Sequence, residues 1–194
     1  MAKKKARPAK RPKAKKPSKP ARKAKSGGAE MSSKQRFLNR YAAEHATTMR
    51  VLRALPPGQG DFRPHPRSQS ANELLYTMLF EQEIGHRVLK GTAIMGQGSP
   101  PPKPASFEEG ITALDQGYQS LAAAMKKASD AQLRSVIQFP VAKGQMGDWN
   151  ALDFIWYMVL LDHIHHRGQM SVYVRLAGGK VPSIYGPSGD DPWT

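Results

Sequence analysis

The sequence predicts an all-α protein, a four-helix bundle preceded by a disordered basic tail. Four stretches carry apolar residues at the spacing of an amphipathic helix, and the linkers between them are polar or rich in Pro and Gly. No stretch alternates convincingly with the period of a β-strand. The chain has 194 residues, enough for one ordinary domain. We therefore expect residues 30–194 to form one bundle with an extended C-terminal segment.

The N-terminal tail, residues 1–29, is defined by its charge. It holds 13 Lys or Arg residues and no acid, whereas residues 30–194 hold 17 basic and 15 acidic residues. A segment rich in Lys, Pro and Ala cannot bury a core and its charges repel, so we predict that it is disordered. We expect the tail to bind nucleic acid without sequence preference, because its side chains neutralise phosphates. A solubilising extension and a contact with acidic lipids are the alternatives. The basic residues are Lys3, Lys4, Lys5, Arg7, Lys10, Arg11, Lys13, Lys15, Lys16, Lys19, Arg22, Lys23 and Lys25.

The first three helices are predicted over residues 31–55, 70–90 and 106–127. A Pro-Pro-Gly run stops the first, and serines cap the second and the third. The second also begins with a capping box, in which Ser70 is followed by Glu73. A short extra turn is expected over residues 129–136, and residues 140–147 are expected to form a loop.

The fourth helix, predicted over residues 150–176, contains the stretch with most chemical information. Asp162 and His166 lie one turn apart on a face that is otherwise largely apolar. Buried polar groups need partners, so this face requires a metal ion, a hydrogen-bond network or a ligand. His163 is expected to face solvent. Trp156 and Leu160 lie opposite Asp162, so the helix is expected to be central or at a subunit interface.

Four ionisable groups are predicted to converge inside the bundle: His45, Glu81, Asp162 and His166. Taken singly, each could be a satisfied core group, with His45 bonded to a tyrosine and Glu81 paired with an arginine of the fourth helix. Taken together, imidazole and carboxylate groups suit Zn²⁺, Ni²⁺, Mn²⁺ or Fe²⁺. Arg167 is expected to contact a carboxylate or a carbonyl at an interface. At the C-terminus, the apolar residues of segment 181–194 are expected to pack on the bundle.

Several classes of protein are excluded or disfavoured by composition. The chain has no cysteine, which excludes disulfides and thiolate chemistry and fits a reducing compartment. The longest apolar run, residues 154–161, is too short to span a bilayer, and no apolar stretch follows the charged N-terminus as in a secretory signal. We predict a cytoplasmic protein without a transmembrane segment. The sequence has no glycine-rich phosphate loop and no nucleophile elbow.

The C-terminal third carries a motif that resembles the signature of DinB/YfiT-like proteins. It consists of His165-His166-Arg167-Gly168-Gln169, then Tyr173-Val174-Arg175-Leu176, then the run from Gly179 to Pro187. The resemblance extends more loosely over residues 31–190. It implies a four-helix bundle, commonly a homodimer, with a metal site built from one histidine of the second helix and an HxxxH pair on the fourth. Relatives include thiol-dependent S-transferases and a maleylpyruvate isomerase.

This sequence departs from that family pattern at two positions. The HxxxH pair falls on Asp162 and His166, and the histidine of the second helix falls near Thr77, a poor ligand for these metals. Glu81, one turn further on, could replace it, as could His45. Otherwise the site is degenerate and metal-free.

Two functions follow as expectations. In the first, the protein is a metal-dependent transferase or hydrolase acting on a small molecule or a thiol conjugate, and its thiol cofactor is unknown. Its metal ligands are Asp162, His166 and Glu81, and the residues facing the substrate are His165, Gln169 and Tyr173. In the second, the bundle is a non-catalytic dimeric binding protein with a decayed metal site, tethered to nucleic acid by its basic tail.

Overall fold

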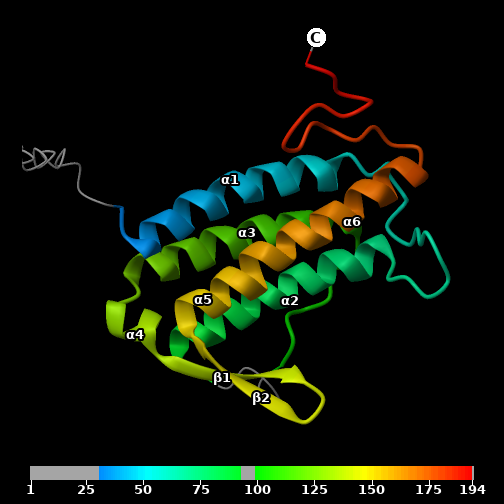
Figure 1. The fold of residues 1–194 in the computed structure, drawn as a ribbon. Coiled ribbons are helices and arrows are strands. Elements are labelled where there is room, and N and C mark those ends of the chain that lie inside the picture. Colours follow the sequence, from blue (N-terminus) through cyan, green and yellow to red (C-terminus); the bar gives the residue numbers. More distant parts are fainter. Residues whose placement is uncertain (1–30, 93–98, 194) are drawn as a thin grey trace, which may run out of the picture. The chain divides into compact units, whose positions relative to one another are not determined.

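The structure, a computed structural model, describes residues 31–92 and 99–193, which form a four-helix bundle (Figure 1). The first three long helices are α1 (Ser33–Arg53), α2 (Ala71–Lys90) and α3 (Phe107–Lys127). The fourth is continuous but has three parts: α5 (Ala151–Ile155), the π-helical segment η1 (Trp156–Leu161) and α6 (Asp162–Leu176). The short helix α4 (Asp130–Arg134) and the strands β1 (Val136–Ala142) and β2 (Gln145–Asn150) connect α3 to α5. The predicted fold class is therefore confirmed.

The predicted helix boundaries are confirmed by the capping groups. The Ser70 hydroxyl accepts a hydrogen bond from the Glu73 amide, and the Glu73 carboxylate accepts one from the Ser70 amide. Helix α2 ends at Gly91, whose φ of 68° lies in the left-handed region that glycine adopts without strain. The Ser106 and Ser129 hydroxyls cap α3 and α4 by accepting from the amides of Glu109 and Gln132. Local sequence thus determines where these helices begin and end.

The core consists of two groups of buried side chains along the bundle. One group joins the end of α2 to α5 and η1, with Phe37, Tyr41, Phe154 and Val159 among its members. The other joins the end of α1 to the start of α2 and the end of α6. Trp156 and Leu160 belong to the first group: Leu160 is buried, and Trp156 packs on Phe37 with ring centroids 5.6 Å apart. Of the two predicted alternatives, a central position or a subunit interface, the structure shows the central one at Trp156 and Leu160, because the chain's own core covers them.

Residues 140–147 are not the predicted loop, since they lie largely within an antiparallel hairpin. Strand β1 pairs with β2 in a register that includes Ile137 opposite Trp149 and Phe139 opposite Gly147. The side chains of Ile137, Phe139 and Trp149 pack against the core, and the alternate residues face solvent. The hairpin turns at Gly144, which has a φ of 72°. Figure 1 shows the hairpin beside the end of the bundle where α5 begins.

The C-terminal segment packs on the bundle through fewer residues than predicted. Val181 is buried, and Ile184 packs on the second core group. The Tyr185 hydroxyl is held by Arg167 and Glu44, although its ring is largely exposed. Trp193 does not pack on the core: 68% of it is exposed, and its indole donates to the Ser183 hydroxyl.

The predicted disorder of residues 1–29 concerns residues that lie outside the described part of the chain. Among the residues that are described, no helix is both long enough and apolar enough to cross a membrane.

Candidate metal site

Three of the four predicted ionisable groups meet between α2 and α6. Glu81 comes from α2, while Asp162 and His166 lie one turn apart at the start of α6. Each offers a ligand atom, and these atoms all lie within 4.8 Å of one another. His166 Nε2 is 3.0 Å from Glu81 Oε1 and 3.7 Å from Asp162 Oδ1. The cluster runs from the core to the surface, since the side chains of Glu81, His166 and Asp162 are 3%, 12% and 34% exposed.

The π-helical segment η1 sets the direction in which these side chains point. A π turn contains one more residue than an α turn, so it rotates the following helix relative to the preceding one. Asp162 is the first residue after η1, so both ligands of α6 are affected by this rotation. π turns are rare in proteins, and they occur frequently at functional sites.

Glu81 is electrostatically the most perturbed group of the cluster. Burial raises its pKa from 4.5 to about 8, against the hydrogen bond and the charge of His166, while Asp162 raises it further. Its Oε1 contacts His166, but its buried Oε2 has no hydrogen-bond donor among the described residues. His163 Nε2 lies 3.3 Å from Oε2, yet its N–H donates to the Met78 carbonyl at 3.0 Å. A buried oxygen without a donor is costly, so this position favours a cation.

Both ring nitrogens of His166 face an oxygen. Nδ1 lies 2.8 Å from Gln169 Oε1, and Nε2 lies 3.0 Å from Glu81 Oε1. Burial lowers the pKa of His166, but hydrogen bonds to Glu81 and Gln169 outweigh it, so the net pKa is raised above 6.5. A lone pair on Nε2 and a charged Oε1 would repel each other at this distance. Either a proton or a metal ion must therefore lie between them.

His163 was predicted to face solvent, and this was wrong. Its side chain is 6% exposed, and burial lowers its pKa to about 3, so it stays neutral. It joins α6 to α2 through its hydrogen bond to the Met78 carbonyl. The assumption of a continuous α-helix caused the error, because η1 turns this position inward. The sequence around His163, which directly follows Asp162, gave no indication that its side chain is buried.

The two alternative positions for the third ligand lie apart from the cluster. His45 Nε2 is 2.8 Å from Asp115 Oδ1, and its ring stacks on Tyr118 with centroids 4.0 Å apart. Burial lowers the pKa of His45 against this contact, so the imidazole tends to be neutral. Thr77 accepts a hydrogen bond from Gln69 and donates one to the Glu73 carbonyl. The structure thus brings Glu81, rather than His45 or Thr77, to Asp162 and His166.

The predicted substrate-facing residues have distinct environments. His165 is exposed, with its ring centroid 5.2 Å from that of His166. Gln169 is exposed and bonds to His166. Tyr173 is buried, and its hydroxyl donates to the Gln69 carbonyl at 2.9 Å. A contact of these three residues with substrate stays a prediction.

Arg167 contacts both predicted kinds of acceptor, but within its own chain rather than at an interface. It donates to the Glu44 carboxylate at 2.7 Å, to the Glu44 carbonyl at 3.2 Å and to the Tyr185 hydroxyl at 2.6 Å. The guanidinium also lies over the Tyr185 ring, 5.0 Å from its centroid. Its role is structural, since these contacts fix the C-terminal segment to α1 and α6.

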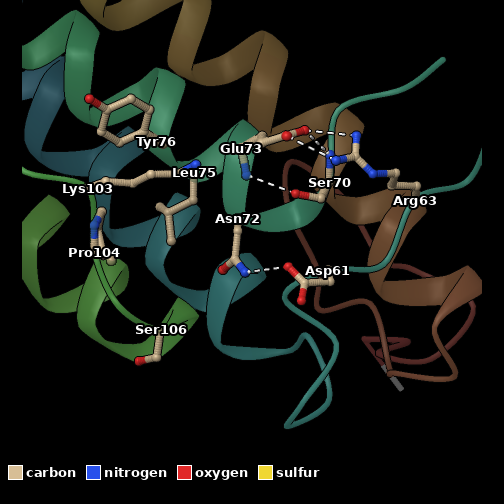
Figure 2. A pocket seen from close by; sticks show the side chains of 11 residues that line it. Asp61, Arg63, Ser70, Asn72, Glu73, Leu75, Tyr76, Lys103, Pro104 and Ser106 are labelled. Atoms are coloured by element: carbon tan, nitrogen blue, oxygen red, sulfur yellow. Dashed lines mark hydrogen bonds and ion pairs between the residues drawn. The ribbon is translucent and has the colours of Figure 1, made fainter. Parts of the chain in front are cut away.

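Two hollows elsewhere in the molecule have different lining. One, of about 150 Å³, lies near the start of α2, and Figure 2 shows that its polar groups largely satisfy one another. Arg63 pairs with Glu73 at 2.8 Å, and Asn72 donates to Asp61 at 3.1 Å. The other is a groove of about 400 Å³ between α2, α3 and the proline-rich segment 101–104. The lining of neither includes a residue of the metal cluster.

Comparisons with known proteins identify the fold. The model of the DinB family matches residues 31–193. A DinB-like protein of Bacillus cereus has a structure that is 21% identical in sequence, with a TM-score of 0.61 over 77% of this chain and 95% of that one. A DinB-like protein of Bacillus subtilis is 17% identical, with a TM-score of 0.57 over 75% and 94%. No protein of curated function matches the chain.

Proposed function

The chain belongs to the DinB family, and we propose that its function depends on a divalent metal ion held by Glu81, Asp162 and His166. The observation that supports this proposal is the convergence of three ligand atoms within 4.8 Å. The donor set fits such an ion, because two carboxylates and one imidazole suit Mn²⁺, Fe²⁺ and Zn²⁺, and Ni²⁺ less closely. The buried Oε2 of Glu81, which has no hydrogen-bond donor among the described residues, also fits a neighbouring cation.

We propose that this centre is catalytic rather than structural. Three protein ligands leave coordination positions open, as in catalytic sites, whereas structural sites are closed by a fourth protein ligand. Asp162 lies at the exposed end of the cluster, so a small molecule can approach from its side. The reaction class is that of a metal-dependent transferase or hydrolase, and a thiol conjugate is the substrate class implied by the family resemblance. The ion supplies a Lewis acid that polarises a substrate oxygen or activates a water or thiol.

Metal binding by the full chain tests this proposal. We expect chelator-treated protein to bind a stoichiometric ion when Mn²⁺, Fe²⁺, Zn²⁺ and Ni²⁺ are titrated separately by calorimetry. His166→Ala should abolish binding, since it removes the only nitrogen ligand of the cluster. His165→Ala is the matched control, because His165 is the exposed neighbour of His166. If none of the four ions binds, the metal-free binding protein replaces the enzyme as the better hypothesis.

We also propose that the protein is a homodimer that associates through the outer face of its last helix. Leu161, Val172 and Leu176, which are 47%, 53% and 58% exposed, lie on one face of this helix, and exposed apolar patches mark interaction sites. Gly168 lies among them, and a Cβ added there would meet nothing within 4 Å. Its lack of a side chain therefore serves no packing inside the chain, although glycine weakens a helix by about 1 kcal/mol.

Light scattering at micromolar concentration tests the dimer. Val172→Glu combined with Leu176→Glu should convert dimers to monomers, because both changes place charge on the proposed interface. Ala123→Glu adds a charge at an exposed position of α3 and should leave the dimer intact. A monomeric wild-type protein would contradict the proposal.

The basic tail supports a second activity, non-specific binding of nucleic acid. Thirteen Lys or Arg residues occur within residues 1–29, whereas residues 30–194 are nearly balanced in charge. We expect binding to a DNA duplex to weaken about 10³-fold or more between 50 and 200 mM salt if most of these charges contact phosphates. Deletion of residues 1–29 should abolish it. A truncated protein that binds DNA equally well would show that the bundle carries this activity.

A further inference from the structure

The two ring nitrogens of His166 face different partners, and this difference decides whether the ring can bind a metal. Nε2 faces Glu81 and Asp162, while Nδ1 lies 2.8 Å from the carboxamide oxygen of Gln169. A neutral imidazole has one N–H donor and one nitrogen with a lone pair, and only the lone pair binds a metal. For Nε2 of His166 to bind a metal at the cluster, the proton of the neutral ring must therefore lie on Nδ1.

We propose that Gln169 is a positioning residue of this site: its carboxamide oxygen accepts the Nδ1–H of His166 and keeps the Nε2 lone pair directed at Glu81 and Asp162. The metal affinity that follows rests on the proposed function, whereas the choice of tautomer rests on the contact alone. Metal-binding histidines commonly donate their second N–H to such an acceptor, which fixes both the tautomer and the orientation of the ring.

The position of Gln169 separates this role from a packing role. It lies three residues after His166 on α6, so the two side chains are neighbours on one helix face. Gln169 is exposed, and its side chain therefore contributes little to the core. Gln169 was predicted from the sequence to face substrate, which stays a prediction, and its oxygen lies 2.8 Å from Nδ1 of His166.

Without an acceptor at Nδ1, the opposite tautomer becomes favourable. Glu81 Oε1 lies 3.0 Å from Nε2 and can accept a proton from it. In that state the ring donates to Glu81 and has no lone pair directed at the cluster. Gln169 thus opposes a hydrogen bond that would otherwise disable His166 as a ligand.

Three variants of the full chain isolate this effect. Gln169→Leu removes the acceptor while keeping a side chain of similar size. Gln169→Glu restores an acceptor in the same place. Gln119→Leu is the control, because Gln119 is also exposed and donates to Asp115 on its own helix at 3.0 Å, away from the cluster.

The tautomer is measured by ¹⁵N NMR of histidine-labelled, chelator-treated protein at a pH above the pKa of Glu81, which burial raises to about 8, so that its carboxylate is ionised. The affinity is measured by calorimetry with Mn²⁺, Fe²⁺, Zn²⁺ and Ni²⁺. We expect Nδ1–H in the wild type, Gln169→Glu and Gln119→Leu, and Nε2–H in Gln169→Leu. The affinity of Gln169→Leu should fall about 10- to 100-fold, and that of Gln169→Glu should stay close to wild type. Nε2–H in the wild type, or a Gln169→Leu variant with unchanged tautomer or affinity, would overturn the inference. If the wild type binds none of the four ions, the proposed function fails, and the tautomer alone decides the role of Gln169.

Discussion

Glu81 is a carboxylic acid that the fold holds almost entirely out of water, next to an imidazole and a second carboxylate. Its side chain is 3% exposed, and its pKa is raised from 4.5 to about 8 by burial, with Asp162 adding to the effect of burial. At neutral pH this group therefore tends to retain a proton when no metal is present. Such a proton is exchangeable for a metal ion, so the apoprotein and the metal complex should respond to pH in opposite directions.

The first prediction concerns this pH dependence. Between the ordinary pKa of 4.5 and the raised value of about 8, the folded chain holds a proton that the unfolded chain has released. The contribution of Glu81 to the free energy of unfolding of the metal-free protein should therefore fall as pH rises through this window, and it is read from the difference between the wild type and Glu81→Gln. Metal affinity should increase over the same window, because binding displaces the proton. Urea denaturation and calorimetry, both at several pH values, measure the two trends.

Glu81→Gln removes the titrating proton and should flatten the Glu81 part of the stability trend while weakening metal binding. Glu108→Gln changes an exposed position of α3 and should leave both trends as in the wild type. A wild-type free energy of unfolding that does not fall relative to that of Glu81→Gln as pH rises from 4.5 to about 8 would contradict the assignment of a raised pKa to Glu81.

The last helix shows which features of an element can be predicted from sequence. The apolar spacing predicted its extent over residues 150–176, and Asn150 caps it in the structure. The π-helical segment η1 was not predicted, because the run Trp156–Leu161 is compatible with an ordinary α-helix and its side chains do not reveal a widened turn. As a result, Glu81, Asp162 and His166 were placed together correctly, but His163 was placed on the wrong side.

The hairpin illustrates a second limit at the scale of elements. Its strands contain Pro140 and Gly147, residues that normally indicate a loop. Strand pairing here depends on Phe139 and Trp149 packing around Phe154, with ring centroids 4.9 and 5.9 Å from it. Phe154 lies in the next helix, so no local pattern could indicate this contact. Helix caps are local, and for that reason the three capped helices were predicted closely.

The second prediction concerns the π turn. Deleting Tyr157, an exposed residue of η1, should convert the turn to an α turn and rotate Asp162 and His166 by about 100° relative to α5. We expect circular dichroism to show a helical protein with much weaker metal binding by calorimetry. Tyr157→Ala keeps the number of residues and should bind metal as the wild type does. Equal affinity in the deletion variant would show that the π turn does not orient the ligands.

At the scale of the whole molecule, a buried ion pair joins α1 to α6, and Tyr185 of the C-terminal segment bonds to both of its members. The side chains of Arg167 and Glu44 are 1% and 4% exposed, and the Tyr185 hydroxyl donates to Glu44 at 2.8 Å. Arg40 also contacts Glu44, at 3.0 Å, from an exposed position. This network connects α1, α6 and the C-terminal segment, so the loss of one partner leaves a charge in the interior.

The third prediction compares two arginines of the same helix. Arg167→Met should lower the free energy of unfolding by about 3–5 kcal/mol, because Glu44 loses its buried partner. Arg175→Met removes an ion pair with Asp190 in which the arginine is 53% exposed, and should cost less than about 1 kcal/mol. Urea denaturation measures both variants. Similar losses in the two would show that burial does not govern the strength of the Arg167 pair.

The distribution of the three ligands along the chain has a consequence for biosynthesis. Glu81 belongs to the second long helix, and Asp162 and His166 belong to the last. At typical rates of translation, the ribosome adds Asp162 on the order of ten seconds after it adds Glu81. Until the last helix emerges and docks, the nascent polypeptide has one carboxylate and no chelating pocket. The proposed ion can therefore be held by all three residues only after the last helix has emerged and docked against the second.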